Sequence, residues 1–491
     1  MPPSSLVSGG RMDWKLNSSD LKRYPHFDKY LPPEEIERIV TDPNRVRTNA
    51  FFPFIRYEKS YQPFRQKGDA EEKPEKKTRE IRYASRRDAY IFAYYRFLLS
   101  QKYNAELDRL GISDNVIAYR KILVKGSPDK GKCNIDFAKD AFDKILALGE
   151  CSAVVLDISK YFESLDHEQI RGLWCRLFGY DDLPPDHHAV FKNITQYRFV
   201  ERDKAYERLG FIGQINDGEK TTRGYLKGFK EMPNQLCSMA DFRAKIAGGS
   251  PEYHSIIEKN VNAYGIPQGA PISDILANLY LIDFDVLIKN YVDSRGGLYL
   301  RYSDDIIVIL PGDEGPGIEA REFVREKIKD FGAQLQIKLS KCALVKFQRR
   351  EDGRLFFTHV EGAKGHNGLE YLGFRFDGEH VFLKDSTISG LYRKITRSLR
   401  KEAMTFIRRY PGKDVEFMVK NFNVDQFVKR FGRVEDFDHS SECEDWTFWT
   451  YARRAQKAFG TRGIKIMHQL KRHRSLVKER AVEEFRAKLA S

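Results

Sequence analysis

The sequence lacks long apolar runs and paired cysteines. No stretch approaches the roughly 18 apolar residues that a membrane helix requires, and the start, MPPSSLVSGGRMDWKLN, lacks the apolar centre of a secretion signal. The six cysteines are scattered and form no CxxC pair of the kind that holds zinc. We therefore expect a cytoplasmic protein with reduced thiols and no membrane partner.

Acidic residues are outnumbered by basic ones. The chain has 84 Lys and Arg against 70 Asp and Glu, which gives a net charge of +14. Such an excess favours an anionic partner, above all nucleic acid; the alternative is a solubilising surface. Hydrophobic residues make up 41% of the chain, which excludes a largely disordered protein. At 491 residues it has room for several packed subdomains.

Short β-branched runs carry acidic residues at their ends. Residues 152–156 (SAVVL) predict a buried strand that ends at Asp157. The runs LYLRY and IIVIL predict two core strands joined as a hairpin, with Asp304 and Asp305 at its tip. Neighbouring carboxylates repel one another unless a cation shares them. The alternative for this pair is a solvated turn.

The three carboxylates would form a metal site if the fold brought them together. Carboxylate oxygens are hard ligands that suit Mg²⁺ or Mn²⁺. Two such ions can activate a 3′ hydroxyl and stabilise a leaving pyrophosphate, which is polymerase chemistry. The same three residues would also suit a nuclease or a cyclase, so the surrounding residues must decide.

Sequence blocks along the chain resemble those of reverse transcriptases in their order and spacing. They are TREIRYASRRD, VVLDISKYFESLDH, GIPQGAPISDILANLYL, LYLRYSDDIIVI, LQIKLSKCALV and YLGFRF. Residues 302–305 form the Tyr-x-Asp-Asp signature of that family, and YLGFRF resembles the hairpin that grips the primer strand. The resemblance implies an RNA-directed DNA polymerase with an α+β, right-hand architecture: fingers and palm of antiparallel sheet plus helices, and a helical C-terminal thumb.

The resemblance and the composition together predict how the chain is divided. We expect an N-terminal extension over 1–60, fingers over 61–150, a palm over 151–345 with a polar insertion at about 180–262, and a palm–thumb hairpin with a basic helical thumb over 346–491.

The resemblance also assigns metal ligands. It makes Asp157 and Asp304 the bridging ligands of two Mg²⁺ ions, with Mn²⁺ as an alternative. Asp305 lies nearby, and the Ile158 carbonyl is a main-chain ligand. Phe162 matches the aromatic residue that stacks beneath the incoming sugar and excludes a 2′ hydroxyl. Its alternative is an ordinary core phenylalanine.

Further residues match positions that contact the nucleotide. Gln268 and Gly269 match a loop that touches nucleotide and template, where glycine permits close approach of the backbone. Arg79 matches the fingers arginine that clamps the triphosphate, with Arg82 as the second candidate. Lys341 matches a lysine that assists the pyrophosphate as general acid or electrostatic partner. The arginines and the lysine are alternatively ordinary surface residues.

Two local features resemble bacterial defence-associated reverse transcriptases of the unknown-group and abortive-infection kind. They are VIAYRK (116–121) with CNIDFAKDAF (133–142), and TFWTYARRAQKAF (447–459). This resemblance implies antiphage defence, dNTPs as substrates, a dedicated noncoding RNA as template, a DNA product and frequent homo-oligomers. A retron-type enzyme and a template-independent DNA polymerase of the same fold are the alternatives. The sequence identifies neither the template RNA nor the primer nor the trigger.

Overall fold

A five-stranded antiparallel sheet organises the centre of the chain. The computed structural model describes residues 14–16, 20–61, 77–124, 126–127, 130–217, 220–228, 231–362, 365–430 and 448–490. The strands have the order β11-β10-β3-β9-β8. They are β3 (Cys151–Asp157), β8 (Leu298–Tyr302), β9 (Asp305–Pro311), β10 (Ala343–Arg349) and β11 (Leu355–Gly362). The predicted strand at 152–156 and the predicted hairpin are both confirmed.

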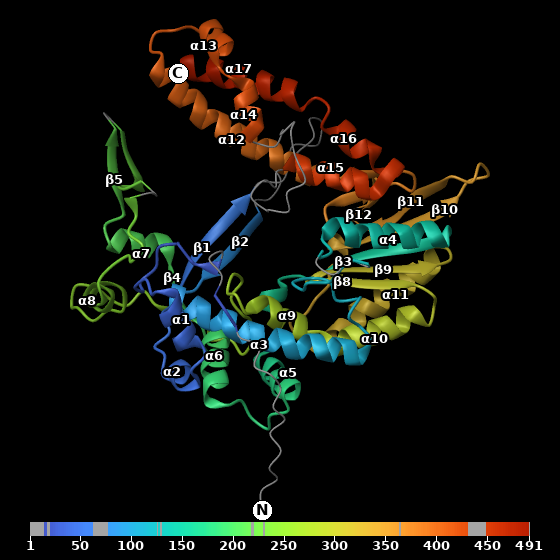
Figure 1. The fold of residues 1–491 in the computed structure, drawn as a ribbon, viewed down its shortest axis with the longest axis horizontal. Helices are drawn as coiled ribbons and strands as arrows, with labels where there is room; N and C mark the ends of the chain where they lie inside the picture. The colour runs from blue at the N-terminus through green and yellow to red at the C-terminus, as the bar shows by residue number, and fades with distance from the viewer. Residues whose placement is uncertain are drawn as a thin grey trace, which may run out of the picture.

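Helices cover both faces of this sheet, which explains its nearly continuous apolar strands. Alternate residues of β3 enter different cores: Val154 and Leu156 enter one, and Ala153 and Val155 enter the other. The first core includes residues of α10 (Ile282–Asp293) and α11 (Glu314–Lys327), and the second includes residues of α4 (Asn134–Leu148). In Figure 1, α4 lies above the sheet, and α10 and α11 lie below it.

A smaller sheet lies beside the large one, with strand order β2-β1-β4-β7. Its strands are β1 (Phe54–Tyr61), β2 (Lys77–Tyr83), β4 (Arg198–Glu201) and β7 (Glu258–Lys259). The parallel pairing of β1 with β4 joins segments far apart in sequence. The remaining elements of this half are α1 (Pro33–Val40), α2 (Pro43–Arg47), α3 (Arg86–Leu110), α5 (His167–Phe178), α6 (Pro185–Thr195), α7 (Arg202–Arg208), β5 (Ile212–Asp217), β6 (Lys220–Tyr225), α8 (Met239–Asp241) and α9 (Ser273–Tyr280).

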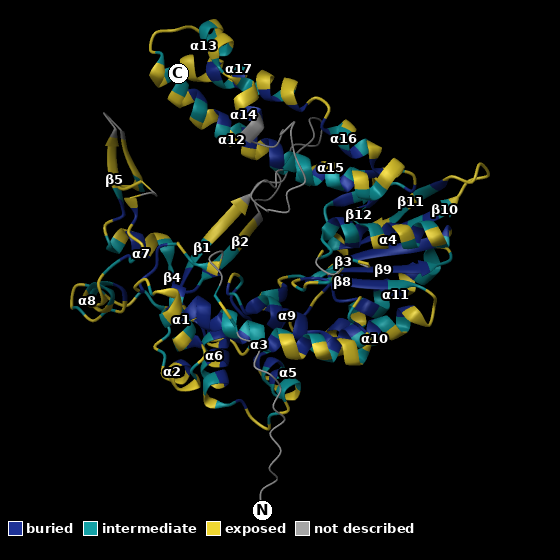
Figure 2. Cartoon of the chain, in the orientation of Figure 1, coloured by how far each residue is buried: buried dark blue, intermediate teal, exposed yellow. Residues whose placement is uncertain are grey.

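The C-terminal part is helical, as its sequence predicts, and follows a three-stranded sheet of β12 (Leu369–Tyr371), β13 (Phe374–Phe376) and β14 (Val381–Leu383). The helices are α12 (Asp385–Arg409), α13 (Val415–Asn421), α14 (Val424–Arg430), α15 (Phe448–Phe459), α16 (Ile464–Gln469) and α17 (His473–Leu489). Helices α12, α13, α14 and α17 share a core of their own. Their outer faces are exposed (Figure 2). No helix in the described residues is long and apolar enough to cross a membrane.

Two apolar segments differ from the single regular element that the local pattern of each predicts. The apolar run from Ser273 predicts one capped helix, but Leu281 leaves the helical region and divides it into α9 and α10. The Ser273 hydroxyl donates to the Pro267 carbonyl at 2.8 Å instead of capping the helix. Residues 335–339 predict a strand, yet they form an isolated bridge between Ile337 and Ile158. In both places burial explains the apolar residues without the expected regular element.

Candidate active site

The end of β3 lies against the tip of the β8–β9 hairpin. Asp157 is the last residue of β3 and pairs in register with Asp305, the first residue of β9. Directly paired residues of antiparallel strands project to the same face, so these two side chains share a face of the sheet. The Ile158 amide donates to the Asp304 carbonyl at 3.0 Å. The fold therefore brings Asp157 and the adjacent pair Asp304 and Asp305, 147 residues later in the sequence, to the same end of the central strands.

The pKa of Asp304 is raised. Burial is the main cause, and the neighbouring charge of Asp157 raises it further, whereas Arg79 and Lys341 lower it. The charge of Asp157 therefore acts on Asp304. The charge of Asp305 acts on different residues, Tyr302 and Tyr371. Burial is the main cause that raises the pKa of both tyrosines, and Asp305 raises it further.

Lys341 supplies the cation that this structure places at the carboxylates. Its Nζ lies 2.5 Å from Oδ1 of Asp157. Lys341 ends a 3₁₀ turn, and β10 follows and pairs with β3 so that Ala343 faces Val155. The pairing thus continues the register up to Lys341 and Asp157. The ion pair is partly open to solvent, with 40% of the lysine side chain and 21% of the aspartate side chain exposed.

The donor set fits a divalent ion held by few protein ligands. Among the described residues, no group of three or more His, Cys, Asp or Glu side chains is arranged to hold a metal ion. Mg²⁺, however, commonly binds through one or two carboxylates and takes its other oxygens from water and substrate phosphates. Asp157 and Asp304 are two mutually repelling carboxylates with a cation already beside them. They suit such an ion if Lys341 moves off Asp157.

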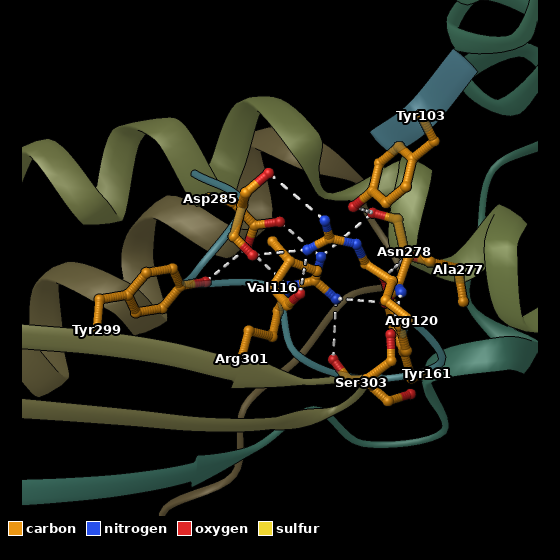
Figure 3. A network of polar contacts seen from close by, with 12 residues as sticks. Tyr103, Val116, Arg120, Tyr161, Ala277, Asn278, Asp285, Tyr299, Arg301 and Ser303 are labelled. Carbon is orange, nitrogen blue, oxygen red and sulfur yellow. Dashed lines mark hydrogen bonds and ion pairs between the residues drawn. The ribbon is translucent and has the colours of Figure 1, made fainter. Parts of the chain in front are cut away.

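A buried guanidinium supports the hairpin tip from below (Figure 3). Arg301 of β8 is fully buried and donates to Asp285 of α10 through Nε at 2.7 Å and Nη2 at 2.5 Å. Its Nη1 donates to the Ser303 carbonyl at 3.2 Å, and Nη2 reaches the Asn278 carbonyl at 3.2 Å. Tyr299 donates to the same Asp285 carboxylate at 2.6 Å. Ser303 has a positive φ of 59°, so these bonds hold the tip in a turn that most residues disfavour.

Phe162 and the loop at 265–271 lie side by side. Phe162 sits in the 3₁₀ turn Tyr161–Glu163 that follows β3, and its carbonyl accepts from the Ile266 amide at 2.8 Å. Its side chain is partly buried against the main core. It is therefore neither a fully buried core residue nor a free surface one.

Gly269 of this loop makes a close backbone contact that the sequence did not reveal. The Gln268 carbonyl accepts from the Arg82 amide at 2.9 Å. Gly269 has a φ of 117°, and a Cβ there would lie 2.7 Å from the Arg82 carbonyl oxygen. The backbone of Gly269 thus closely approaches β2 of the small sheet. The sequence analysis explained this glycine by close approach to the nucleotide and template.

The two candidate arginines differ in their environment. Arg79 is exposed, and its charge lowers the pKa of Asp304 against the larger effect of burial. Arg82 is buried, pairs with Glu80, and stacks over the rings of Tyr197 and Phe199. Arg79 is therefore an exposed residue whose charge acts on Asp304, whereas Arg82 is engaged within the small sheet.

Comparison with known proteins shows which family the region around the hairpin resembles. Residues 235–376 match the family described as "Reverse transcriptase (RNA-dependent DNA polymerase)". The chain carries a domain of the reverse transcriptase family. The matched range contains Gln268, Gly269, Asp304, Asp305 and Lys341. Asp157 and Phe162 precede it and join it through the pairing of β3 with β9.

Relatives of the reverse transcriptase domain cover parts of the chain. The retron Ec86 reverse transcriptase of Escherichia coli is 34% identical over 123 residues, which are 25% of this chain and 37% of that protein. Telomerase from Candida albicans, in complex with a TWJ fragment of telomeric RNA, has a TM-score of 0.38 at 12% identity, over 90% of this chain and 65% of that one. Apo telomerase from Candida tropicalis, truncated from the C-terminal domain, has a TM-score of 0.37 at 11% identity, over 63% and 53%.

The expected α+β architecture is present: helices accompany antiparallel sheets, and the C-terminal part is helical. The assignment of these parts to palm, fingers and thumb stays a prediction. The strand pairing does not follow the predicted division of the chain. Strands β4 and β7, which lie in the predicted palm insertion, belong to the same sheet as β1 and β2. The exact residue boundaries of the parts stay a prediction.

Sequence reasoning missed the residues beneath the reverse transcriptase hairpin. Arg301 is the one charged residue of the strand LYLRY, and Asp285 lies within the apolar helix run FDVLI. A charge inside an apolar pattern is buried only when it is paired. Two such exceptions in neighbouring elements are the signal that could have predicted this ion pair.

Proposed function

We propose that this chain is an RNA-directed DNA polymerase that adds dNTPs to a primer by two-metal-ion phosphoryl transfer. The observation that carries the proposal is the pairing of Asp157 with Asp305, which sets the end of β3 beside Asp304 at the hairpin tip. The matched family and the net charge of +14 support a nucleic-acid substrate. We infer an RNA template and a DNA product as its partners.

The proposed roles follow from the positions of the side chains. Asp157 and Asp304 would hold two Mg²⁺ ions, with Asp305 and the Ile158 carbonyl beside them and Mn²⁺ as a substitute. When bound, these ions supply Lewis-acid activation of the 3′ hydroxyl and charge stabilisation of the leaving pyrophosphate. The 3′ oxygen forms a bond to the α-phosphorus as the bond from that phosphorus to the pyrophosphate oxygen breaks.

Other side chains would bind and orient the nucleotide. Arg79 is exposed opposite Asp304 and suits the triphosphate, since a guanidinium offers a planar fork to phosphate oxygens; Arg82 would support it through β2. Phe162 would lie under the sugar and exclude a 2′ hydroxyl, with Gln268 and Gly269 beside it. Lys341, released from Asp157, would donate a proton or its charge to the pyrophosphate.

Primer extension with the full chain tests the proposal. The assay contains a DNA primer on an RNA template, dNTPs and Mg²⁺. Asp304→Asn and Asp157→Asn should each lower extension by about 10³-fold or more, because each removes a charge that the metal ions require. The matched control is Asp293→Asn, which alters an exposed carboxylate paired with Lys289 at the end of α10. Wild-type extension in both active-site variants would refute the proposal.

A biological role in antiphage defence, with a dedicated noncoding RNA as template, belongs to the same proposal. The similarity to the retron Ec86 reverse transcriptase favours a retron-type enzyme as the second candidate. A template-independent polymerase is the third. Sequencing the RNA and DNA that copurify with wild type and Asp304→Asn separates them: a single copied RNA supports the first two, and untemplated DNA supports the third. Phage plating on cells with either protein tests defence.

We place this activity in the cytoplasm. The described cysteines, Cys133, Cys151, Cys175, Cys237 and Cys342, form no disulfide, and Cys443 lies outside the described residues. Free thiols are typical of a reducing compartment. A homo-oligomer is part of the proposal, and light scattering of the purified chain measures it.

A further inference from the structure

The segment before α4 covers the free edge of the catalytic hairpin. β8 is an outer strand of the large sheet, and Val116 forms a parallel bridge with Arg301. The Arg301 amide donates to the Asn115 carbonyl at 2.8 Å, and the Ile117 amide donates to the Arg301 carbonyl at 3.0 Å. Figure 3 shows Val116 beside Arg301. This edge segment, residues 115–117, leads directly to Tyr119 at the tip.

Tyr119 is held in a backbone conformation that tyrosine disfavours. Its φ is 60°, in the left-handed region where a side chain crowds the backbone. Its neighbours fix it there: the Ala118 carbonyl accepts from Asn278 at 2.8 Å, and the Tyr119 carbonyl accepts from Arg96 at 3.2 Å. Arg96 is itself held by two bonds to Asp274. Strained residues persist where surrounding structure requires them, and they concentrate at functional sites.

The side chain of Tyr119 lies at the hairpin tip and remains accessible. Its hydroxyl is 3.4 Å from the Ser303 hydroxyl, and its ring centroid is 6.3 Å from that of Tyr302. The residue is 42% exposed. Such exposure argues against a core role for the ring, because an apolar face at the surface gains little from packing. An aromatic face open to solvent beside a catalytic tip is suited to stacking on a nucleotide.

The sheet order indicates which nucleotide this is. β9 lies between β3 and β8, so Phe162, which follows β3, and Tyr119, at the outer edge of β8, lie on opposite sides of the tip. Tyr119 contacts Tyr302, which packs against the core that contains Tyr371 of β12. β12 and β13 carry the sequence that resembles a primer grip. Tyr119 therefore lies on the primer side of the site.

We propose that Tyr119 contacts the primer-terminal nucleotide and that its strained backbone holds the ring in position for this contact. The inference rests on the proposed polymerase function. It concerns binding of the primer–template duplex and predicts no role in binding the incoming dNTP. The ring supplies a stacking face, and the left-handed backbone of Tyr119 sets its orientation.

Kinetics and equilibrium binding with a DNA primer on an RNA template test this role. Tyr119→Ala should raise the KM for the duplex about ten-fold, since it removes one stacking ring, and leave the KM for dNTP unchanged. Tyr119→Phe keeps the ring and should stay near wild type. Tyr119→Gly relieves the backbone strain and should still lose duplex affinity, as Tyr119→Ala does. Tyr225→Ala, which alters a tyrosine of β6 that is 48% exposed, is the control.

Duplex binding measured by fluorescence anisotropy without dNTP separates this inference from the polymerase proposal. If the wild type binds the duplex but never extends it, the proposed function fails, while a ten-fold weaker affinity of Tyr119→Ala still supports the contact. If the wild type extends the primer and Tyr119→Ala binds the duplex equally well, the contact is refuted. A rise in the KM for dNTP alone would also overturn it. So would DNA covalently attached to the wild type and absent from Tyr119→Phe, because Tyr119 would then be the primer.

Discussion

Two ion pairs flank the hairpin tip, and they differ in burial while having the same length. Beneath the tip, Arg301 and Asp285 are 2.5 Å apart with both side chains fully buried. Above it, Lys341 and Asp157 are also 2.5 Å apart, but 40% and 21% of their side chains are exposed. Separation alone therefore does not tell what a charged contact does.

Burial decides whether a partner can leave. A lone buried charge lacks the water that would solvate it, so breaking a buried pair costs about 3–5 kcal/mol. An exposed pair contributes about 0–1 kcal/mol, because water replaces the lost partner. The pair beneath the tip thus fixes the position of the catalytic turn. The pair above it can exchange Lys341 for another cation.

Breaking the buried pair of Arg301 and Asp285 should have the largest effect on stability. Arg301→Met leaves Asp285 buried without its partner and should lower the free energy of unfolding by about 3–5 kcal/mol, measured by denaturant titration. Arg176→Met is the matched control, because it breaks a pair with Asp283 in which each side chain is 50% exposed; its effect should stay below about 1 kcal/mol. Equal losses in the two variants would contradict the comparison.

A double variant separates folding from positioning beneath the tip. Arg301→Met with Asp285→Leu removes both charges and should recover much of the lost stability. Primer extension should nevertheless remain at least about ten-fold low, because the Ser303 carbonyl loses its donor and the tip its support. Full recovery of extension would mean that Arg301 serves stability alone.

Removing the Lys341 cation should change activity more than stability. Lys341→Met should alter the free energy of unfolding by less than about 1 kcal/mol, and lower the extension rate about 10²-fold at saturating dNTP. Lys338→Met, at an exposed lysine three residues earlier, is the control. A strongly destabilised Lys341→Met protein would show that the upper pair is also structural.

Substitution of Phe162 tests whether the nucleotide binds on the side of the tip where the exposed pair of Lys341 and Asp157 lies. Phe162→Ala should reduce the preference for dNTP over rNTP about ten-fold, since a smaller side chain no longer excludes a 2′ hydroxyl. Single-nucleotide incorporation measures the ratio of kcat/KM for the two substrates. The control is Phe356→Ala on the outer strand β11. An unchanged ratio would assign Phe162 to the core.

The smallest expected effect is a pH dependence of the stability that Asp304 causes. Burial raises the pKa of Asp304, so the folded chain keeps this proton at a pH where the unfolded chain has lost it. Stability should therefore fall as pH rises from the unfolded pKa, about 4, through the raised folded value. Asp304→Asn should be more stable than the wild type at pH 7, and the difference should vanish near pH 3.

Added Mg²⁺ gives the complementary measurement. An ion that binds the folded state raises its stability, so Mg²⁺ should raise the melting temperature of the wild type and leave that of Asp304→Asn unchanged. Stabilisation of both proteins by the same amount would place the ion elsewhere. A wild type that is more stable than Asp304→Asn at pH 7 without metal would contradict the pH argument.

Much of the site could be predicted because its signals are local. The runs SAVVL, LYLRY and IIVIL are rich in β-branched or aliphatic and aromatic residues and lie next to acidic residues, and each formed the expected strand. The split between α9 and α10 could not be predicted. Every residue of α9 except Asp274 is buried, so no apolar stripe marks where the helix must bend.

The structure also corrected reasons that the sequence suggested. Arg79 and Arg82 are the first and second sequence candidates for one role, yet Arg82 is buried against two aromatic rings and Arg79 is exposed. Gly269 is required by the Arg82 carbonyl of β2, more than 180 residues earlier. Such facts depend on long-range pairing, which no local pattern specifies.

By itself, the sequence determined the three strands around the site and that carboxylates would lie at their ends, because apolar periodicity and turn chemistry act over a few residues. The tertiary structure alone decided that Asp157 meets Asp305, that Arg301 is buried on Asp285, and that Tyr119 reaches the tip. The reason is that a charge or a strained backbone acquires its role from neighbours brought together by sheet pairing and burial.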